Sequence, residues 1–167
     1  LESLGSARSK ADAITSKLTK SISAKYQENP AYYDSFSKRI KTALEQYKEK
    51  VITEAEYLAK MRAIMEDYHA GKSTIAYPES IKNNVHAQAF YGVLSSDFAA
   101  EMSIAITQII AAHSQVDWTN NKTIHDRISQ DIDDLFYHYE KERGLKLSFD
   151  TIDKIIENVK TVALRRF

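Results

Sequence analysis

The chain has 167 residues, a formal net charge of +0 at pH 7, no cysteine, four glycines and two prolines. This length suits one stable domain without a metal or disulfide, and the lack of cysteine excludes thiol nucleophiles, cysteine–zinc sites and redox switches. Scarce glycine and proline disfavour a fold with many tight turns. We therefore predict an all-α fold, a compact bundle of about seven helices with no sheet.

Three helices are predicted in the first half of the chain, because apolar residues recur there at helical spacing. They cover residues 8–27, 30–50 and 53–71. The residues expected to begin or end them are Ser9 with Asp12, Asn29 with Pro30, the capping box Thr53 with Glu56, and Gly71.

After a loop over residues 72–79, four more helices are predicted. They cover residues 81–94, 98–110, 124–139 and 150–162. Their expected end residues are Ser96 or Asp97, then Asp117, Gly144 and Asp150. The helix over 98–110 is apolar around most of its circumference, so we expect it to be the buried axis of the fold.

The first residues of the chain and its longest apolar stretch indicate its origin and its location in the cell. Residues 1–6 are expected to be linker or cloning-derived sequence, and 7–167 a single helical domain with 8–27 as an arm. Because the chain begins with Leu1 and not methionine, we expect a fragment or a processed piece of a longer protein. The apolar stretch over 98–112 is too short and too interrupted to span a bilayer, so we expect no membrane partner and a cytoplasmic location.

Charge is unevenly distributed along the chain. Residues 7–27 carry five cations and one acid, whereas residues 131–142 carry five acids and one cation. A neutral chain does not coat nucleic acid by overall charge, but a local patch can hold backbone phosphates. The predicted DNA-contacting residues are Lys10, Lys17, Lys20, Lys25, Lys38, Arg39 and Lys41. A solvated helix face explains the same positions, and this alternative stays open.

No pattern has the spacing of a catalytic or metal site. Residues 71–74 resemble the end of a phosphate-binding loop, but the first glycine of that motif would fall at Glu66, inside a predicted helix. His138 and Glu140 have the spacing of a zinc-deaminase motif without the cysteines that complete it. We predict no catalytic residue, no metal and no cofactor in this chain.

Three segments together resemble one protein family. They are Asn29-Pro30-Ala31-Tyr32-Tyr33-Asp34, Ala87-Gln88-Ala89-Phe90-Tyr91-Gly92-Val93-Leu94, and Val116-Asp117-Trp118 followed by Ile124 and Ile128. They are similar to the C-terminal domain of the motor subunit, HsdR, of type I restriction enzymes, above all in the type IC branch. The likeness spans roughly residues 7–167. Its motif positions, with a structural or a docking role, are Phe90, Tyr91, Asp117 and Trp118. In the structural alternative Trp118 fills the core and Asp117 caps the sixth helix.

The resemblance implies nuclease and helicase domains upstream, in a parent subunit that uses ATP and Mg²⁺. It implies that this region is a non-catalytic assembly domain beside those other domains. Its implied role is to dock the motor onto the methyltransferase core of modification and specificity subunits, with non-specific contact to double-stranded DNA. A different hypothesis is a stand-alone helical adaptor that binds only protein. A third and weaker one is a metallohydrolase that uses His138 and Glu140.

Overall fold

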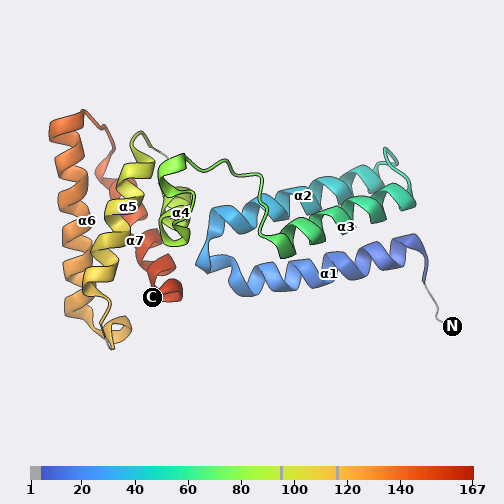
Figure 1. Ribbon diagram of the computed structural model, residues 1–167, viewed down its shortest axis with the longest axis horizontal. Helices are drawn as coiled ribbons and strands as arrows, with labels where there is room; N and C mark the ends of the chain where they lie inside the picture. The colour runs from blue at the N-terminus through green and yellow to red at the C-terminus, as the bar shows by residue number, and fades with distance from the viewer. Residues whose placement is uncertain (1–4, 95, 116) are drawn as a thin grey trace. The chain divides into compact units, whose positions relative to one another are not determined.

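A computed structural model describes residues 5–94, 96–115 and 117–167. The chain is 80% helical, with seven α-helices and no strand in the described part, which confirms the predicted all-α class. The helices are α1 (Ala7–Lys25), α2 (Pro30–Lys48), α3 (Glu54–Ala70), α4 (Val85–Val93), α5 (Ala99–His113), α6 (Lys122–Arg143) and α7 (Phe149–Arg166) (Figure 1). Short 3-10 turns are η1 (Tyr26–Glu28), η2 (Glu79–Ile81) and η3 (Trp118–Asn120). Residues 1–4 of the predicted terminal segment and Val116 of the predicted motif lie outside the described residues.

The ends of α3 follow their predicted signals. The amide of Glu56 donates to Thr53 Oγ1 at 3.1 Å, and the amide of Thr53 donates to Glu56 Oε1 at 2.9 Å, which completes the capping box. Gly71 ends the helix in the left-handed region with φ 71°. Pro30 is likewise the first residue of α2, and Gly144 with φ 72° ends α6, as predicted.

Two predicted N-caps are wrong by two or three positions. The cap of α1 is Ser6, whose Oγ accepts from the amide of Ser9 at 3.0 Å. The cap of α7 is Ser148, whose Oγ accepts from the amide of Thr151 at 3.2 Å. Both serines have the extended backbone that an N-cap requires. The predicted caps Ser9 and Asp150 lie inside the first helical turn.

The starts of α4 and α5 also differ from prediction. Residues 79–81 form η2, and α4 begins only after Asn84, whose Oδ1 accepts from the amide of Ala87 at 2.9 Å. Ser96 and Asp97 do not cap α5. Its preceding residue is Phe98, in a left-handed conformation with φ 65° and no side-chain cap. A polar residue near the start of a helix is therefore not always its N-cap. The N-cap is the residue directly before the first helical turn, and the path of the backbone decides which residue that is.

The described chain divides into two compact units, each with its own core. The first unit contains α1, α2 and α3, and α1 packs most closely against α3. Its buried core residues are Ala11, Leu18, Ile22, Phe36, Ile40, Ala43, Tyr57, Leu58, Met61 and Ile64. Since α1 contributes its apolar face to this core, its remaining surface faces solvent.

The second unit contains α4 to α7 together with Gln27–Pro30. In it α5 packs against α4 and α6, and α7 packs against α4 and α6. Met102, Ile106 and Ile110 of α5 are fully buried, whereas Ile104 and Ile109 are half-buried. The helix predicted to be the buried axis of the whole fold, α5, is thus central to the second unit alone. The first unit buries a separate apolar cluster. The single domain over 7–167 stays a prediction, since one domain can contain two compact units.

Candidate functional site

Four of the predicted DNA-contacting lysines lie on α1. They are Lys10, Lys17, Lys20 and Lys25, and all four side chains are exposed. They are spread over about 22 Å of helix axis, at about 1.5 Å per residue. None of them forms an ion pair with a described carboxylate, whereas Arg8 on the same helix lies 3.7 Å from Asp12. The α1 lysines are therefore available to an anionic partner.

The other three predicted positions lie on α2. Lys38 and Lys41 are exposed. Arg39 is half-buried, and its Nη2 lies 2.9 Å from Asp67 Oδ2 on α3. Its charge is thus already engaged by a carboxylate. Lys38 and Arg39 line a groove between α2 and α3 whose lining residues include none from α1.

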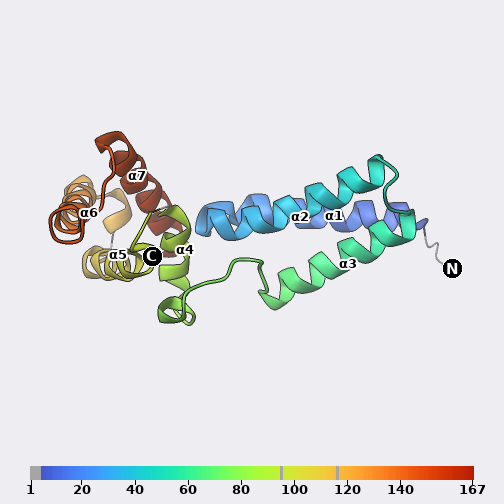
Figure 2. The same cartoon turned by 90° about the horizontal axis from the view of Figure 1, so that it is seen from above.

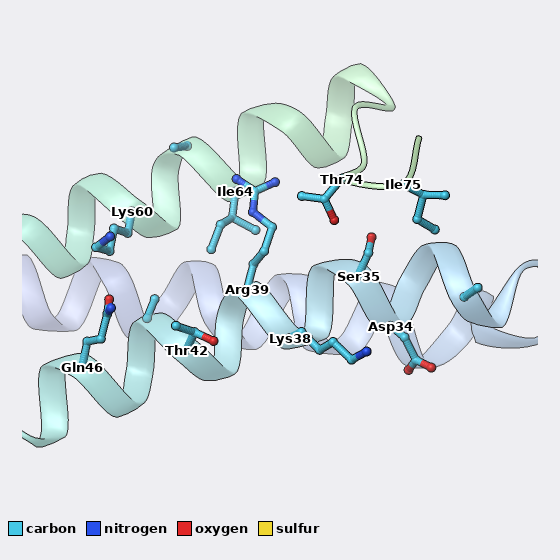
Figure 3. Close-up of a pocket in the computed structure, with 13 residues that line it drawn as sticks. Asp34, Ser35, Lys38, Arg39, Thr42, Gln46, Lys60, Ile64, Thr74 and Ile75 are labelled. Atoms are coloured by element: carbon cyan, nitrogen blue, oxygen red, sulfur yellow. The ribbon is translucent and has the colours of Figure 1, made fainter. Parts of the chain in front are cut away.

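This groove, the α2–α3 groove, has a volume of about 800 Å³ (Figure 3). Its lining residues are Ala31, Asp34, Ser35, Lys38, Arg39, Thr42, Ala43 and Gln46 of α2, Lys60, Ala63 and Ile64 of α3, and the following Thr74 and Ile75. Figure 2 shows that α3 diverges from α2 toward the C-terminal end of α3. Sequence reasoning missed the groove because α2 and α3 each show an ordinary amphipathic pattern.

The Asp117–Trp118 motif forms a turn in the second unit. Trp118 is 4% exposed and packs in that core, with its ring 5.5 Å from the His125 ring. This is the predicted structural alternative for Trp118. The predicted N-cap role of Asp117 is wrong, because η3 separates it from α6 and Asn121 Oδ1 accepts from the amide of Ile124 instead, at 3.3 Å.

The other two motif positions also pack within the second unit. Phe90 is fully buried in the core of α4 to α7. Tyr91 is half-buried, with its ring 6.0 Å from the Tyr77 ring. Both residues therefore contribute packing contacts to the second unit, and a docking role for them stays a prediction.

A protein-family model described as type I restriction enzyme HindI endonuclease subunit-like, C-terminal, matches residues 2–163. The chain belongs to this family. The match confirms the predicted resemblance to the C-terminal domain of type I restriction endonuclease subunits. Searches of curated proteins and of solved structures each found no match.

The residues considered for metal chemistry, His138 and Glu140, both lie on α6 of this restriction-subunit domain. His138 is exposed on α6 and its ring contacts Tyr139 edge-on at 5.8 Å, while Glu140 is half-buried on the same helix. In the described part of the chain, no group of three or more histidine, aspartate or glutamate residues is placed to hold a metal ion. No described helix is long and apolar enough to cross a membrane.

A contact that the sequence did not reveal holds the C-terminus of the second unit. Arg166 Nη1 donates to the Glu28 carbonyl at 2.8 Å, and Arg166 Nε donates to His86 Nδ1 at 3.1 Å. The Phe167 ring lies 4.5 Å from the His86 ring. No local pattern could predict these contacts, because they join residues far apart in the sequence.

The His86 contact predicts a pH dependence of stability. Burial, and then the charge of Arg166, lower the pKa of His86 below its ordinary value of 6.5. The unfolded state then binds a proton more readily than the folded state, so stability is expected to fall as the pH drops through 6.5 and to level off below the folded pKa. Urea unfolding from about pH 8 to about pH 5 measures this.

The matched control for this experiment is another histidine. His86→Gln should remove the fall in stability near pH 6.5. His138→Gln, at an exposed position of α6, should leave the wild-type pH profile in place. Identical profiles for His86→Gln and the wild type would contradict the prediction.

Proposed function

We propose that this chain is a non-catalytic assembly domain that docks a type I restriction endonuclease subunit onto its methyltransferase core. The core is the complex of modification and specificity subunits, and the other domains of the parent subunit are further partners. In this proposal the ATP- and Mg²⁺-dependent chemistry belongs to those other domains, in a cytoplasmic enzyme. The α1 lysines contact double-stranded DNA without sequence preference.

The docking role is supported chiefly by the family match over residues 2–163. The matched family is the C-terminal part of an endonuclease subunit, and a subunit must contain surfaces that hold its partners. The described residues carry no metal-binding group that would give this part chemistry of its own. Assembly is therefore the function that its features support best.

The DNA contact is supported by the exposed and unpaired lysines of α1. Duplex DNA carries one negative charge per about 1.7 Å of helix axis. The α1 lysines, spread along about 22 Å of helix axis, would therefore lie opposite several phosphates. Contacts to phosphates depend on charge and not on the base sequence of the DNA. With a net charge of +0, the attraction comes from the α1 lysines alone, so the affinity should be weak and should fall steeply with salt.

Two binding measurements on the purified chain test the proposed function. In gel filtration we expect it to co-elute with the purified modification–specificity complex. In fluorescence anisotropy we expect it to bind a labelled duplex of unrelated sequence only at low salt. Binding to the complex without DNA binding would leave a domain that docks protein alone. If the chain does not bind the modification–specificity complex, the proposal is wrong.

We also expect the purified chain to show no nuclease, ATPase or methyltransferase activity. ATP hydrolysis that disappears in the Lys72→Ala variant would contradict the non-catalytic assignment.

A further inference from the structure

The α2–α3 groove is an open groove bounded by two helices that contact each other through side chains, among them the Phe36 and Tyr68 rings, 5.3 Å apart, and the Arg39–Asp67 ion pair. Closely packed helices have axes about 8–10 Å apart. In the first unit α1 and α3 are closely packed, but the described residues of α2 and α3 are not, and α3 diverges from α2 (Figure 2). The groove has a volume of about 800 Å³.

The walls of the groove suit close approach by another helix. Ala31 lines it from α2 and Ala63 from α3, whereas Ala43, also in the lining, is buried in the first core. Small side chains let a neighbouring backbone come close. The half-buried Ile75 adds apolar surface, whereas Ile64, also in the lining, is buried in the first core (Figure 3). An apolar stripe on an incoming helix would therefore find matching surface on both walls.

The groove also carries positive charge. Lys38 and Lys60 line it from opposite walls, and neither forms an ion pair with a described carboxylate, although the charge of Lys60 contributes to lowering the pKa of Glu56. The one acid in the lining, Asp34, accepts a hydrogen bond from the Tyr26 hydroxyl at 3.2 Å. An occupant with carboxylates beside its apolar stripe would complement this charge.

The mixed lining favours protein over DNA as the occupant. A phosphate backbone is polar throughout, so seating it against Ile75, Ala31 and Ala63 would remove its charged groups from water without replacing their hydrogen bonds. An amphipathic helix satisfies both features, because its apolar face covers the groove and its flanking carboxylates meet the lysines.

We propose that the α2–α3 groove binds an amphipathic helix of the methyltransferase core, with acidic residues beside the apolar stripe of that helix. This inference rests on the proposed docking function and gives it a location on the chain. The α1 lysines are not part of this surface and remain the proposed DNA contact.

A steric test fills the groove. Ala63→Trp places a large side chain on the α3 wall, at an exposed position where the fold does not need a small residue. We expect it to weaken binding to the purified methyltransferase core by about tenfold or more. The control is Ala55→Trp, at an exposed alanine of α3 outside the groove lining, which should bind as the wild type does.

A charge test reverses one lysine. Lys60→Glu should weaken core binding by about tenfold at low salt and by less at high salt, because the interaction is screened. Lys48→Glu makes the same charge change on α2 outside the lining and should have little effect.

A footprint uses the absence of cysteine in the chain. In Ala63→Cys, the methyltransferase core should slow alkylation of the new thiol, whereas in Ala55→Cys it should not. This measurement needs only a small substitution, so it decides the question if Ala63→Trp does not fold.

The outcomes separate this inference from the proposed function. If the wild-type chain does not bind the core, both fail. If the wild type binds but Ala63→Trp binds equally well, or the Ala63→Cys thiol is not protected, the docking function stands and the groove assignment is wrong. Loss of DNA binding in Ala63→Trp with core binding intact would overturn the assignment and make the groove a nucleic-acid surface.

Discussion

Phe136→Ala is expected to lower the free energy of unfolding of the second unit by about 3–5 kcal/mol. Phe136 is fully buried on α6 in the core formed by α4 to α7, and truncation would leave a large cavity among rigidly packed neighbours. Urea unfolding measures the loss, and hydrogen exchange locates it. Amides of α5 to α7 should lose protection, while those of α1 to α3 should keep theirs.

The neighbouring residue provides the control for this prediction. Tyr137 follows Phe136 on the same helix but is 60% exposed, so Tyr137→Ala should change stability by no more than about 0.5 kcal/mol. Equal losses for the two variants would show that Phe136 is not a core residue. Equal loss of protection in α1 to α3 would show that the two cores unfold as one.

Replacing Lys17, Lys20 and Lys25 with alanine is expected to weaken DNA binding and to flatten its salt dependence. Each neutralised phosphate contributes about −0.9 to the slope of log K against log salt, so three lost contacts would flatten it by about 2.7. The three side chains are exposed, and their removal leaves the buried residues of α1 intact. Anisotropy titrations with one duplex at several salt concentrations measure the slope.

A second triple variant distinguishes the effect of the α1 lysines on DNA binding from the effect of overall net charge. Lys141, Lys146 and Lys154 are exposed lysines of the second unit, and their replacement by alanine makes the same change in net charge. Their loss should leave the slope almost unchanged. If both triple variants flatten it equally, DNA responds to net charge. If neither does, the α1 lysines are only a solvated helix face.

Local chemistry in the sequence was enough for the helical class and for several helix ends. Two kinds of helix end depend only on residues within one helical turn, so residue identity alone predicts them. They are the Thr53 capping box and the left-handed glycines Gly71 and Gly144. Where two polar residues competed for a cap, as with Ser6 and Ser9, the letters were insufficient. The extended backbone of Ser6 decides that case.

The sequence by itself determined the family, the helical class and the identity of the exposed cations on α1. Only the tertiary structure decided which contacts the cations of α2 make. Periodicity shows which face of a helix is buried but not which helix covers it. The partners of α1 and α3, the Arg39–Asp67 ion pair and the α2–α3 groove all depend on that choice. The division into two cores has the same cause, because the apolar stripe of a helix does not specify which cluster it joins.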